Sequence, residues 1–491
     1  MSRSHSSEIS LRCERSSNRI ISGPPRFPSL SARSSTARRI APGCHYDSPA
    51  GLRFRRGPNR MALGERGGVR PRSPSGGSGG SPACMDFKYA GAVKRNGDLA
   101  LRIMIVGERI LPFRHAGDKN FWLDMIRRLL VAGHEVEALS VDIEATPGNG
   151  LPIRHVPQIP VYFRPDARFN AEHSQFGGVN NYVSKTTNVP IILREVRRRQ
   201  RTFRADVIHF ADNFGPATVL LRAISRKVPL TLSAPTYHRN RPLYDAMLLA
   251  SFSSFAVVVP FSEAYRRRLL ELGFPSGRIR RIRWGIDVSQ FTPPTDEARA
   301  AARASLGLER GKFVVLWTGF TQQTNERDLQ ESIRIATLTL ERRPLEFIFC
   351  FKPEHFKPHF RNFERSGIRV VNAPEVFRSA CMAADVFLCP IQDSRSIAAP
   401  PLVWPELLAM GIPILTTDIP GTDEAVVDGE SGFAVRSPQE AQGRLLEIEA
   451  DSALQRRLRD GARRIAVERF SVDRAMDEYV DMWSTLVAQS R

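Results

Sequence analysis

The fold is decided by the stretch from Leu101 to Val141, which contains LRIMIVG (101–107), NFWLDMIRRLLVA (120–132) and HEVEALSV (134–141). The first and third segments are short apolar runs of the kind found in strands that are buried on both faces of a sheet. The middle segment repeats apolar residues at helical spacing and is followed by Gly133, a residue type that commonly ends helices. Together the three segments predict a β-α-β unit.

The same alternation of strands and helices continues along the chain in two successive series. The first series ends near Trp284, and the second begins at Lys312. In the first series we expect further strands at Asp206–Phe210, Val228–Ser233, Ser254–Pro260 and Arg280–Trp284, and helices at Ile191–Arg201 and Ser262–Leu272. In the second series we expect strands at Lys312–Thr318, Leu345–Cys350, Ile368–Val371, Val386–Cys389 and Pro413–Thr416, and helices at Arg327–Leu340, Val376–Ala384 and Pro405–Met410.

Two such series in one chain predict an α/β protein with two doubly wound, Rossmann-like domains that face each other across a cleft. We expect an N-terminal domain over residues 99–288 and a C-terminal domain over residues 289–491, with the last helices packing back toward the first domain. The hinge is expected near Gly285–Pro294, because glycine and paired prolines interrupt both patterns there. Ligands of such sheets bind beyond the carboxyl ends of the strands.

Residues 1–98 differ in composition from the rest of the chain and are expected to form a disordered basic extension. Residues 1–84 carry 15 arginines and no lysine against four acidic residues, and so account for +11 of the net charge of +20. Their scarce apolar residues offer too little burial to offset the entropy of ordering. A solvated tail is the favoured interpretation, with an overextended start and Met85 as the initiator as one form of it, and an arm that binds nucleic-acid phosphates is the alternative.

Several classes of protein are excluded by the sequence. No apolar run approaches the ~20 residues of a membrane-spanning helix. Six cysteines without a CxxC pair indicate neither a disulfide framework nor a zinc ribbon. No GxGxxG follows the first strand and no GxxxxGK(S/T) occurs, which disfavours dinucleotide-dependent enzymes and P-loop NTPases.

The stretch most informative about function runs from Val386 to Gly432. A buried strand is followed by a long loop, Pro390–Pro401, and then by a helix that carries Glu406 in its first turns. The N-terminus of a helix offers free N–H groups and a positive dipole end to an anion. Glu406 could accept hydrogen bonds from ribose hydroxyls, or it could merely complement the dipole of its own helix.

Motifs along both series occur in an order that a known family shares. Pro405–Ile414 (PELLAMGIPI) is followed by two glycine-bearing turns, Pro420–Glu424 (PGTDE) and Asp428–Gly432 (DGESG), and the hinge contains GIDVSQFTP at Gly285–Pro293. This order resembles that of the retaining glycosyltransferases with the two-domain GT-B fold, specifically family 4. The resemblance covers about residues 101–485.

The resemblance implies a retaining, metal-independent transferase without a cofactor, which moves a sugar from a nucleotide-diphosphate donor to a glycan or lipid-linked acceptor. Its mechanism would consist mostly of positioning and charge stabilisation. The residues expected in the site are His238 and Gly117 as catalytic, Glu406, Arg395, Lys352, Pro401 and Leu402 as donor-binding, and Asp212 and Tyr237 as acceptor-binding, with Arg395 and Lys352 chosen as nearby cations and not from a family motif. His238 aligns with a family histidine beside the reacting sugar, with an incidental loop histidine as the alternative. Variable loops within Pro147–Tyr182, where no pattern is recognisable, would contact the acceptor.

Three positions depart from the family pattern at the donor site. Ala398 stands where the family has its first glutamate, and Phe320 and Asn325 stand near its diphosphate-binding arginine and lysine. Arg395 is the preferred substitute cation, with a solvated loop arginine as the equal alternative. The departures leave a second hypothesis open, namely a catalytically degenerate GT-B scaffold or regulatory subunit.

A basic run on an expected helix of the first domain, REVRRRQR at residues 194–201, bears on location. Related enzymes often glycosylate lipid-linked acceptors at the inner membrane face, where each nearby cation contributes about 1 kcal/mol. We therefore expect a cytoplasmic protein that binds an anionic membrane surface peripherally, with a solvated helix face as the alternative. No specific nucleic-acid partner is expected.

Overall fold

The structure is a computed structural model of the whole chain, and it describes residues 100–490 apart from several short segments. The segments outside the description are 109, 111–116, 143–149, 159–176, 226–227, 235–241, 310, 320–325, 352–355 and 393–399. The expected disordered extension over residues 1–98 also lies outside the described residues.

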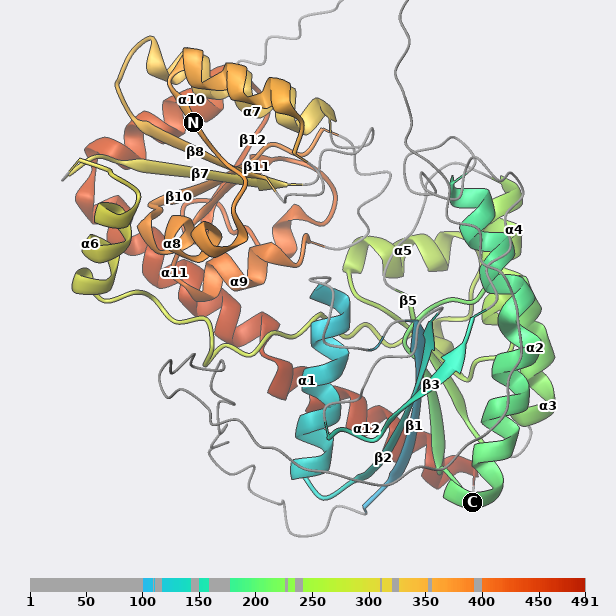
Figure 1. Cartoon of the computed structure of the whole chain (residues 1–491). Helices are drawn as coiled ribbons and strands as arrows, with labels where there is room; N and C mark the ends of the chain where they lie inside the picture. The colour runs from blue at the N-terminus through green and yellow to red at the C-terminus, as the bar shows by residue number, and fades with distance from the viewer. Residues whose placement is uncertain are drawn as a thin grey trace, which may run out of the picture. The chain divides into compact units, whose positions relative to one another are not determined.

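The first half of the described chain forms a six-stranded sheet in which all neighbouring strands are parallel (Figure 1). Its strands are β1 (Arg102–Glu108), β2 (Glu135–Asp142), β3 (Ile153–Pro157), β4 (Val207–Phe210), β5 (Leu230–Ala234) and β6 (Val257–Pro260). They are ordered β3-β2-β1-β4-β5-β6 across the sheet. Strands β1, β4 and β5 are buried on both faces, which accounts for their nearly continuous apolar sequences.

Helices cover both faces of this sheet and so form two apolar cores. The helices are α1 (Gly117–Val131), α2 (Gly177–Phe203), α3 (Arg222–Ser225), α4 (Pro242–Phe252) and α5 (Glu263–Glu271). Alternate residues of β1 enter the two cores, because successive side chains of a strand point to opposite faces. Ile103 and Ile105 pack with Trp122 of α1, whereas Met104 and Val106 pack in the core that contains α2.

The second half forms another six-stranded parallel sheet, ordered β12-β11-β10-β7-β8-β9. Its strands are β7 (Val314–Gly319), β8 (Glu346–Phe351), β9 (Ile368–Val371), β10 (Val386–Cys389), β11 (Ile414–Thr417) and β12 (Gly432–Val435). Its helices are α6 (Asp296–Ser305), α7 (Glu326–Leu340), α8 (Pro374–Ala383), α9 (Val403–Ala409), α10 (Pro438–Ala450) and α11 (Ser452–Phe470).

Both sheets have the strand order 3-2-1-4-5-6 when each is numbered from its own first strand. This is the order of the doubly wound nucleotide-binding fold, and it confirms the predicted α/β class with two Rossmann-like halves. The strand order reverses between β1 and β4 in the first sheet and between β7 and β10 in the second. In such folds the ligand binds beside this reversal, at the carboxyl ends of the strands.

Two short strands were not expected from the sequence. Strand β3 lies at the sheet edge within Pro147–Tyr182 and buries only Val156, so it has no apolar run to reveal it. Strand β12 begins at Gly432, where a Cβ would stand 1.9 Å from the carbonyl oxygen of Ile414. Glycine is therefore required by the close approach of β11, although glycine normally weakens a strand prediction.

The expected strand at Arg280–Trp284 is wrong. The backbone N–H of Arg280 still donates to the carbonyl of Val258 in β6 (3.1 Å), but the described pairing with β6 ends there. The arginines of this segment instead bind carboxylates of other elements: Arg280 pairs with Asp481, and Arg281 and Arg283 pair with Glu424. The alternation of arginine and apolar residues thus belongs to a connecting segment and not to a sheet edge.

The last helix, α12 (Val472–Ser490), packs on the first sheet. Tyr479, Met482 and Trp483 belong to the same apolar core as helix α1, beside which α12 lies in Figure 1. Polar atoms of α12 also find partners on β5. Trp483 Nε1 donates to Thr231 Oγ1 (3.1 Å), and Tyr479 Oη lies 2.7 Å from Ser233 Oγ. The C-terminal end of the chain is therefore built into the N-terminal sheet.

His209 of β4 lies at the centre of this polar contact and is fully buried. Its Nδ1 is 2.8 Å from Thr231 Oγ1 and its Nε2 is 3.0 Å from Ser233 Oγ. The ring centroids of Trp122 and Tyr479 lie 4.6 and 5.3 Å from that of the imidazole. Burial lowers the pKa of His209 to about 3, so the imidazole is neutral in the folded protein near pH 7.

The linker that leaves the first sheet is paired through its main chain with the junction of α11 and α12. The N–H of Ile286 donates to the carbonyl of Phe470 (2.8 Å), and the N–H of Val472 donates to the carbonyl of Ile286 (2.9 Å). A Cβ on Gly285 would stand 2.4 Å from Val472 Cα, so only glycine permits this approach. The two chain connections between the sheets are thereby bonded to each other.

A buried guanidinium, that of Arg128, binds both of these chain connections. Arg128 of α1 places Nη2 3.1 Å from Asp287 Oδ2 and Nε 2.6 Å from Asp473 Oδ1, so it binds the linker and α12 together. Asp287 also accepts hydrogen bonds from Ser289 and Gln290. Burial alone would raise the pKa of Asp287, but the hydrogen bonds from Ser289 and Arg128 outweigh burial and hold its pKa below the ordinary value.

We expect Gly285→Ala to lower the free energy of unfolding by about 1–3 kcal/mol, because the added methyl group forces the linker away from Val472. Urea unfolding followed by circular dichroism measures the change. Gly443→Ala, in α10 where a Cβ would have no atom within 4 Å, is the matched control. The control should be neutral or up to about 1 kcal/mol more stable. Equal stability of Gly285→Ala and the unchanged protein would contradict the close packing.

The buried imidazole of His209 should make stability fall in mild acid. The unfolded chain takes up a proton near pH 6.5, whereas the folded protein resists protonation down to about pH 3. The resulting loss is up to about 1.4 kcal/mol for each pH unit below 6.5. Urea unfolding at several pH values between 7 and 4 measures the slope, and His209→Gln, which cannot titrate, should have a shallower one. Identical slopes for the two proteins would exclude this role.

Candidate functional site

The carboxyl ends of β7 and β10 lie beside the strand-order reversal of the second sheet, and buried polar contacts hold the chain there. Asp328, in the first turn of α7, accepts the N–H of Gln392 just beyond β10 (2.7 Å). Thr416 Oγ1 in β11 donates to the carbonyl of Cys389 (2.7 Å), and Thr417 Oγ1 donates to that of Ile391. These contacts fix where the loop toward α9 begins. Asp328 was not predicted as a site residue, and the only sequence signal for it is an acidic residue in the first turn of a helix.

Helix α9 carries Glu406 in its first turn, between buried neighbours on both sides in sequence. The side chain of Glu406 is half-buried and lies close enough to the thiol of Cys381 in α8 to contribute to the raised pKa of that thiol, which is due first to burial. Pro401 and Leu402 precede the helix and are half-buried, and Leu402 packs against the apolar core of α1 and α12. Glu406, Pro401 and Leu402 are thus brought together on one segment.

The first sheet presents Asp212 at its own strand-order reversal. Asp212 follows β4, is buried, and accepts the N–H of Glu108 at the end of β1 through Oδ2 (2.8 Å). It therefore bridges the two strands between which the order reverses. Gly117 is the first residue of α1. Both residues lie on elements that follow the carboxyl ends of strands, where ligands of this fold bind.

The remaining residues named from the sequence lie outside the described part of the chain. They are Tyr237, His238, Arg395 and Lys352, together with the departures Ala398, Phe320 and Asn325. Their assignments stay predictions.

Glu424 is a buried carboxylate that joins elements of the two halves, a role that was not predicted from the sequence. It accepts hydrogen bonds from the backbone N–H of Glu263 at the start of α5, from Arg281 Nη1 (3.1 Å) and from Arg283 Nε (3.1 Å). Its main-chain carbonyl accepts from Arg469 Nη1 (3.2 Å). The turn after β11 is therefore held to the first helix turn after β6. The glycine-bearing PGTDE motif was visible in the sequence, but its partners were not.

Among residues 100–490 within the description, no group of three or more His, Cys, Asp or Glu side chains could hold a metal ion. None of the described helices combines the length and the apolar character needed to cross a bilayer.

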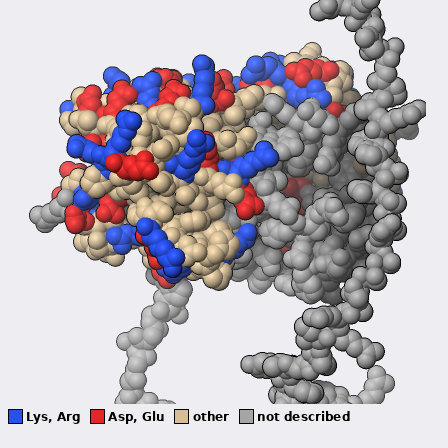
Figure 2. All heavy atoms as spheres, turned by 90° about the horizontal axis from the view of Figure 1, so that it is seen from above, with Lys and Arg blue, Asp and Glu red and all other residues tan. Residues whose placement is uncertain are grey.

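In the basic run on α2, some arginines form ion pairs within the first domain and others are exposed without a described partner acid. Arg199 Nε pairs with the buried carboxylate of Glu137 in β2 (2.6 Å), and Arg198 pairs with Glu195 one turn away (2.6 Å). Arg194 and Arg197 are exposed. On the face of the molecule seen in Figure 2, basic and acidic side chains of the described residues are interspersed without a large patch of one sign. Part of the run thus serves the fold of the first domain.

Two family models match the chain in succession. The model "Glycosyl transferase 4-like domain" matches residues 117–285, and the model "Glycosyl transferases group 1" matches residues 298–451. The first match spans the first sheet from α1 onward, the second spans the second sheet, and the gap between them falls on the linker. The chain belongs to the family 4 glycosyltransferases with the GT-B fold.

The curated relatives of the chain have low sequence identity to it. Spore coat protein SA of Bacillus subtilis is 23% identical over 307 residues, which cover 57% of this chain and 78% of that protein. The D-inositol 3-phosphate glycosyltransferase of Corynebacterium urealyticum is 31% identical over 198 residues, which cover 36% of this chain and 45% of that enzyme. That of Nocardia farcinica is 30% identical over 190 residues, with 36% and 40% covered. The aligned part spans less than half the length of these two glycosyltransferases.

Solved structures share the fold at low sequence identity. A glycosyltransferase from Rickettsia africae superposes with a TM-score of 0.61 at 13% identity, covering 79% of this chain and 99% of that one. Sucrose-phosphate synthase from Thermosynechococcus elongatus gives 0.58 at 15% identity, covering 79% and 100%. Anabaena HepE in complex with UDP gives 0.57 at 15% identity, covering 78% and 100%.

Glu424→Gln should lower the free energy of unfolding by about 1–3 kcal/mol, because an amide leaves Arg281 and Arg283 without their carboxylate partner. Asp423→Asn, which removes the same charge at the exposed neighbouring position, is the matched control and should change little. Urea unfolding of both variants measures the difference. Equal effects of the two substitutions would show that charge alone, and not the buried contact, is responsible.

Proposed function

We propose that the protein is a retaining glycosyltransferase that moves a sugar from a nucleoside-diphosphate donor to a glycan or lipid-linked acceptor without a metal ion. The observation that carries the proposal is the succession of the two family matches over two sheets of identical strand order. The position of Glu406 supports it as well, because this carboxylate lies on the helix that follows the carboxyl edge of the second sheet.

The donor would lie against the second sheet. A half-buried carboxylate on a short helix suits paired ribose hydroxyls, since both are donors and the carboxylate accepts through two oxygens. Glu406 is assigned this role, and Pro401 and Leu402 would flank the nucleotide. The diphosphate needs compensating positive charge, for which we assign Arg395 and Lys352.

The acceptor and the reacting sugar would lie against the first sheet. Gly117, at the start of α1, allows the backbone to approach a phosphate or sugar closely. We assign His238 to a contact with the transferred sugar, and Asp212 and Tyr237 to the acceptor. Catalysis would then rest on positioning and on stabilising the departing diphosphate, which leaves from the face by which the acceptor enters.

Names of the similar proteins suggest which substrates to test first. UDP is bound in the Anabaena HepE structure, so UDP-sugars are the first donors. The matched D-inositol 3-phosphate glycosyltransferases make phosphorylated polyols sensible acceptors beside lipid-linked glycans. The exposed Arg194 and Arg197 of α2 suit a cytoplasmic protein that approaches an anionic membrane surface peripherally.

A second candidate function is a GT-B scaffold or regulatory subunit without donor chemistry. The specific observation in its favour is the replacement of three family donor-site residues by Ala398, Phe320 and Asn325. A binding experiment with nucleotides separates the two, because a scaffold that has lost the donor site does not need to bind them.

Titration calorimetry with UDP and other nucleoside diphosphates tests the proposal on the full chain. We expect one of them to bind, and Glu406→Gln to weaken binding about tenfold, the effect of losing roughly one charge-assisted hydrogen bond, with an unchanged melting temperature. Glu341→Gln, an exposed carboxylate just beyond α7, is the control and should bind as the unchanged protein does.

The outcomes separate the hypotheses. If no nucleoside diphosphate binds at millimolar concentration, the scaffold takes the place of the transferase. If Glu406→Gln unfolds the protein, the carboxylate serves its helix and not the ribose. In an active preparation, the anomeric configuration of the product by NMR decides retention, and activity in the presence of a chelator decides metal independence.

A further inference from the structure

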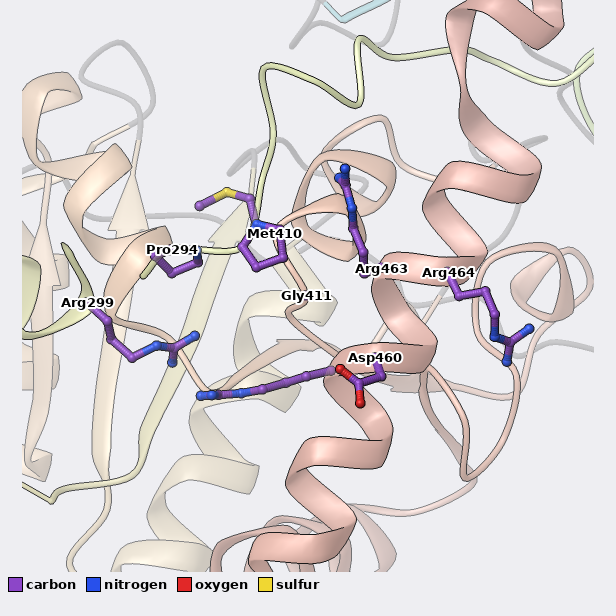
Figure 3. Close-up of a pocket in the computed structure, with 9 residues that line it drawn as sticks. Pro294, Arg299, Met410, Gly411, Asp460, Arg463 and Arg464 are labelled. Carbon is purple, nitrogen blue, oxygen red and sulfur yellow. The ribbon is translucent and has the colours of Figure 1, made fainter. Parts of the chain in front are cut away.

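A cavity of about 330 Å³ lies between the linker and helix α11, away from the site described above. Pro293 and Pro294 of the linker, Met410 and Gly411 at the end of α9, and arginines of α6 and α11 line it (Figure 3). Its volume is at the lower end of the range of small-molecule sites.

The cavity is at the amino edge of the second sheet. Gly411 lies at the turn that leads into β11. Asp385, which directly precedes β10, accepts the N–H of Val314, the first residue of β7, through Oδ2 (2.9 Å). Strands β7, β10 and β11 therefore separate this edge from the carboxyl edge by roughly 13–20 Å, the length of four to six residues. The donor site proposed above cannot be the same site.

One buried carboxylate, that of Asp385, binds three guanidiniums beside the cavity. Asp385 accepts from Arg299 Nη1 (3.1 Å), Arg303 Nη2 (2.6 Å) and Arg459 Nη2 (2.8 Å). Burial, followed by the charge of Arg459, lowers the pKa of Arg299 to about 10. The charges of Asp385 and Asp296 oppose this lowering of the pKa but do not cancel it.

Arg463 also lines the cavity, and it has no described carboxylate partner. Arg463 Nη1 donates to three carbonyl oxygens, of Val288 (3.0 Å), Phe291 (2.7 Å) and Ala409 (2.9 Å). Carbonyls orient the guanidinium but do not neutralise it. Arg464 lines the cavity as well, but it pairs with Glu430 and so adds no net charge.

The charges around the cavity leave an excess of one. Among the described residues, four arginines (Arg299, Arg303, Arg459 and Arg463) lie near three carboxylates, Asp385 and the exposed Asp296 and Asp460. An excess of positive charge among several guanidiniums suits a phosphate group, which guanidiniums bind through paired hydrogen bonds. Pro293, Pro294 and Met410 add an apolar wall for the organic part of such a ligand.

From these contacts we infer that the cavity is a second ligand site, which binds the phosphate group of a small organic phosphomonoester. The ligand would contact the linker through Pro293 and Pro294. It would also contact α11, whose Arg463 holds the linker to the end of the helix that carries Glu406. Ligand binding in this cavity would therefore affect the connection between the two sheets.

Phosphate binding to the full chain tests the inference, with inorganic phosphate and glycerol phosphate as the probes. Equilibrium dialysis is carried out at low salt, with and without excess UDP to occupy the donor site. We expect Arg459→Gln to weaken binding of both probes about tenfold. Arg456→Gln, the same change at an exposed position of the same helix, should leave binding within about twofold of the unchanged protein.

Asp460→Asn gives a test that loss of folding cannot imitate, because removing this lining carboxylate should tighten phosphate binding. Unchanged binding in Arg459→Gln, or equal weakening in Arg459→Gln and Arg456→Gln, would overturn the site. Competition by UDP that is lost in Glu406→Gln would overturn it too, since the phosphate would then occupy the donor site. Glycerol phosphate competing with phosphatidic acid vesicles, against neutral vesicles, distinguishes a free ligand from a lipid headgroup.

Discussion

The structure depends on a main-chain pairing between two segments far apart in the sequence. Ile286, in the linker that leaves the first sheet, exchanges backbone hydrogen bonds with Phe470 and Val472 at the junction of α11 and α12. Gly285 permits the pairing, because a side chain there would overlap Val472. Both covalent connections between the two sheets pass through this point, so a change in one connection is transmitted to the other.

Charged side chains near this main-chain pairing bind several partners each, and these partners lie on different elements. Arg128 binds carboxylates of the linker and of α12, and Glu424 binds Arg281, Arg283 and a backbone N–H of α5. A buried ion is tolerated only when several partners compensate its lost hydration. The cost of burial therefore restricts these contacts to one arrangement, and they fix which turn of the second half lies against which helix of the first.

The two edges of the second sheet have different chemistry. At the carboxyl edge, Asp328 and threonine hydroxyls hold the main chain, and the following helix presents Glu406. At the amino edge, Asp385 gathers three guanidiniums. Helix α9 connects the two, since its first turn carries Glu406 and its last carbonyl, that of Ala409, accepts from Arg463. A ligand at either edge would thus act on the same short helix.

Local sequence determined the two α/β series, because strands buried on both faces need apolar runs such as Leu101–Gly107, and the motif order indicated the family. Local sequence did not reveal β3, because that strand buries a single residue. It also wrongly predicted a strand at Arg280–Trp284, whose arginines bind distant carboxylates. Glu406 was predicted as a site residue because a motif surrounds it, and its role stays a prediction. The ion pairs of Glu424, the place of α12 and the convergence on Asp385 were decided only by tertiary structure, since each joins residues more than 70 positions apart whose attraction no local pattern records.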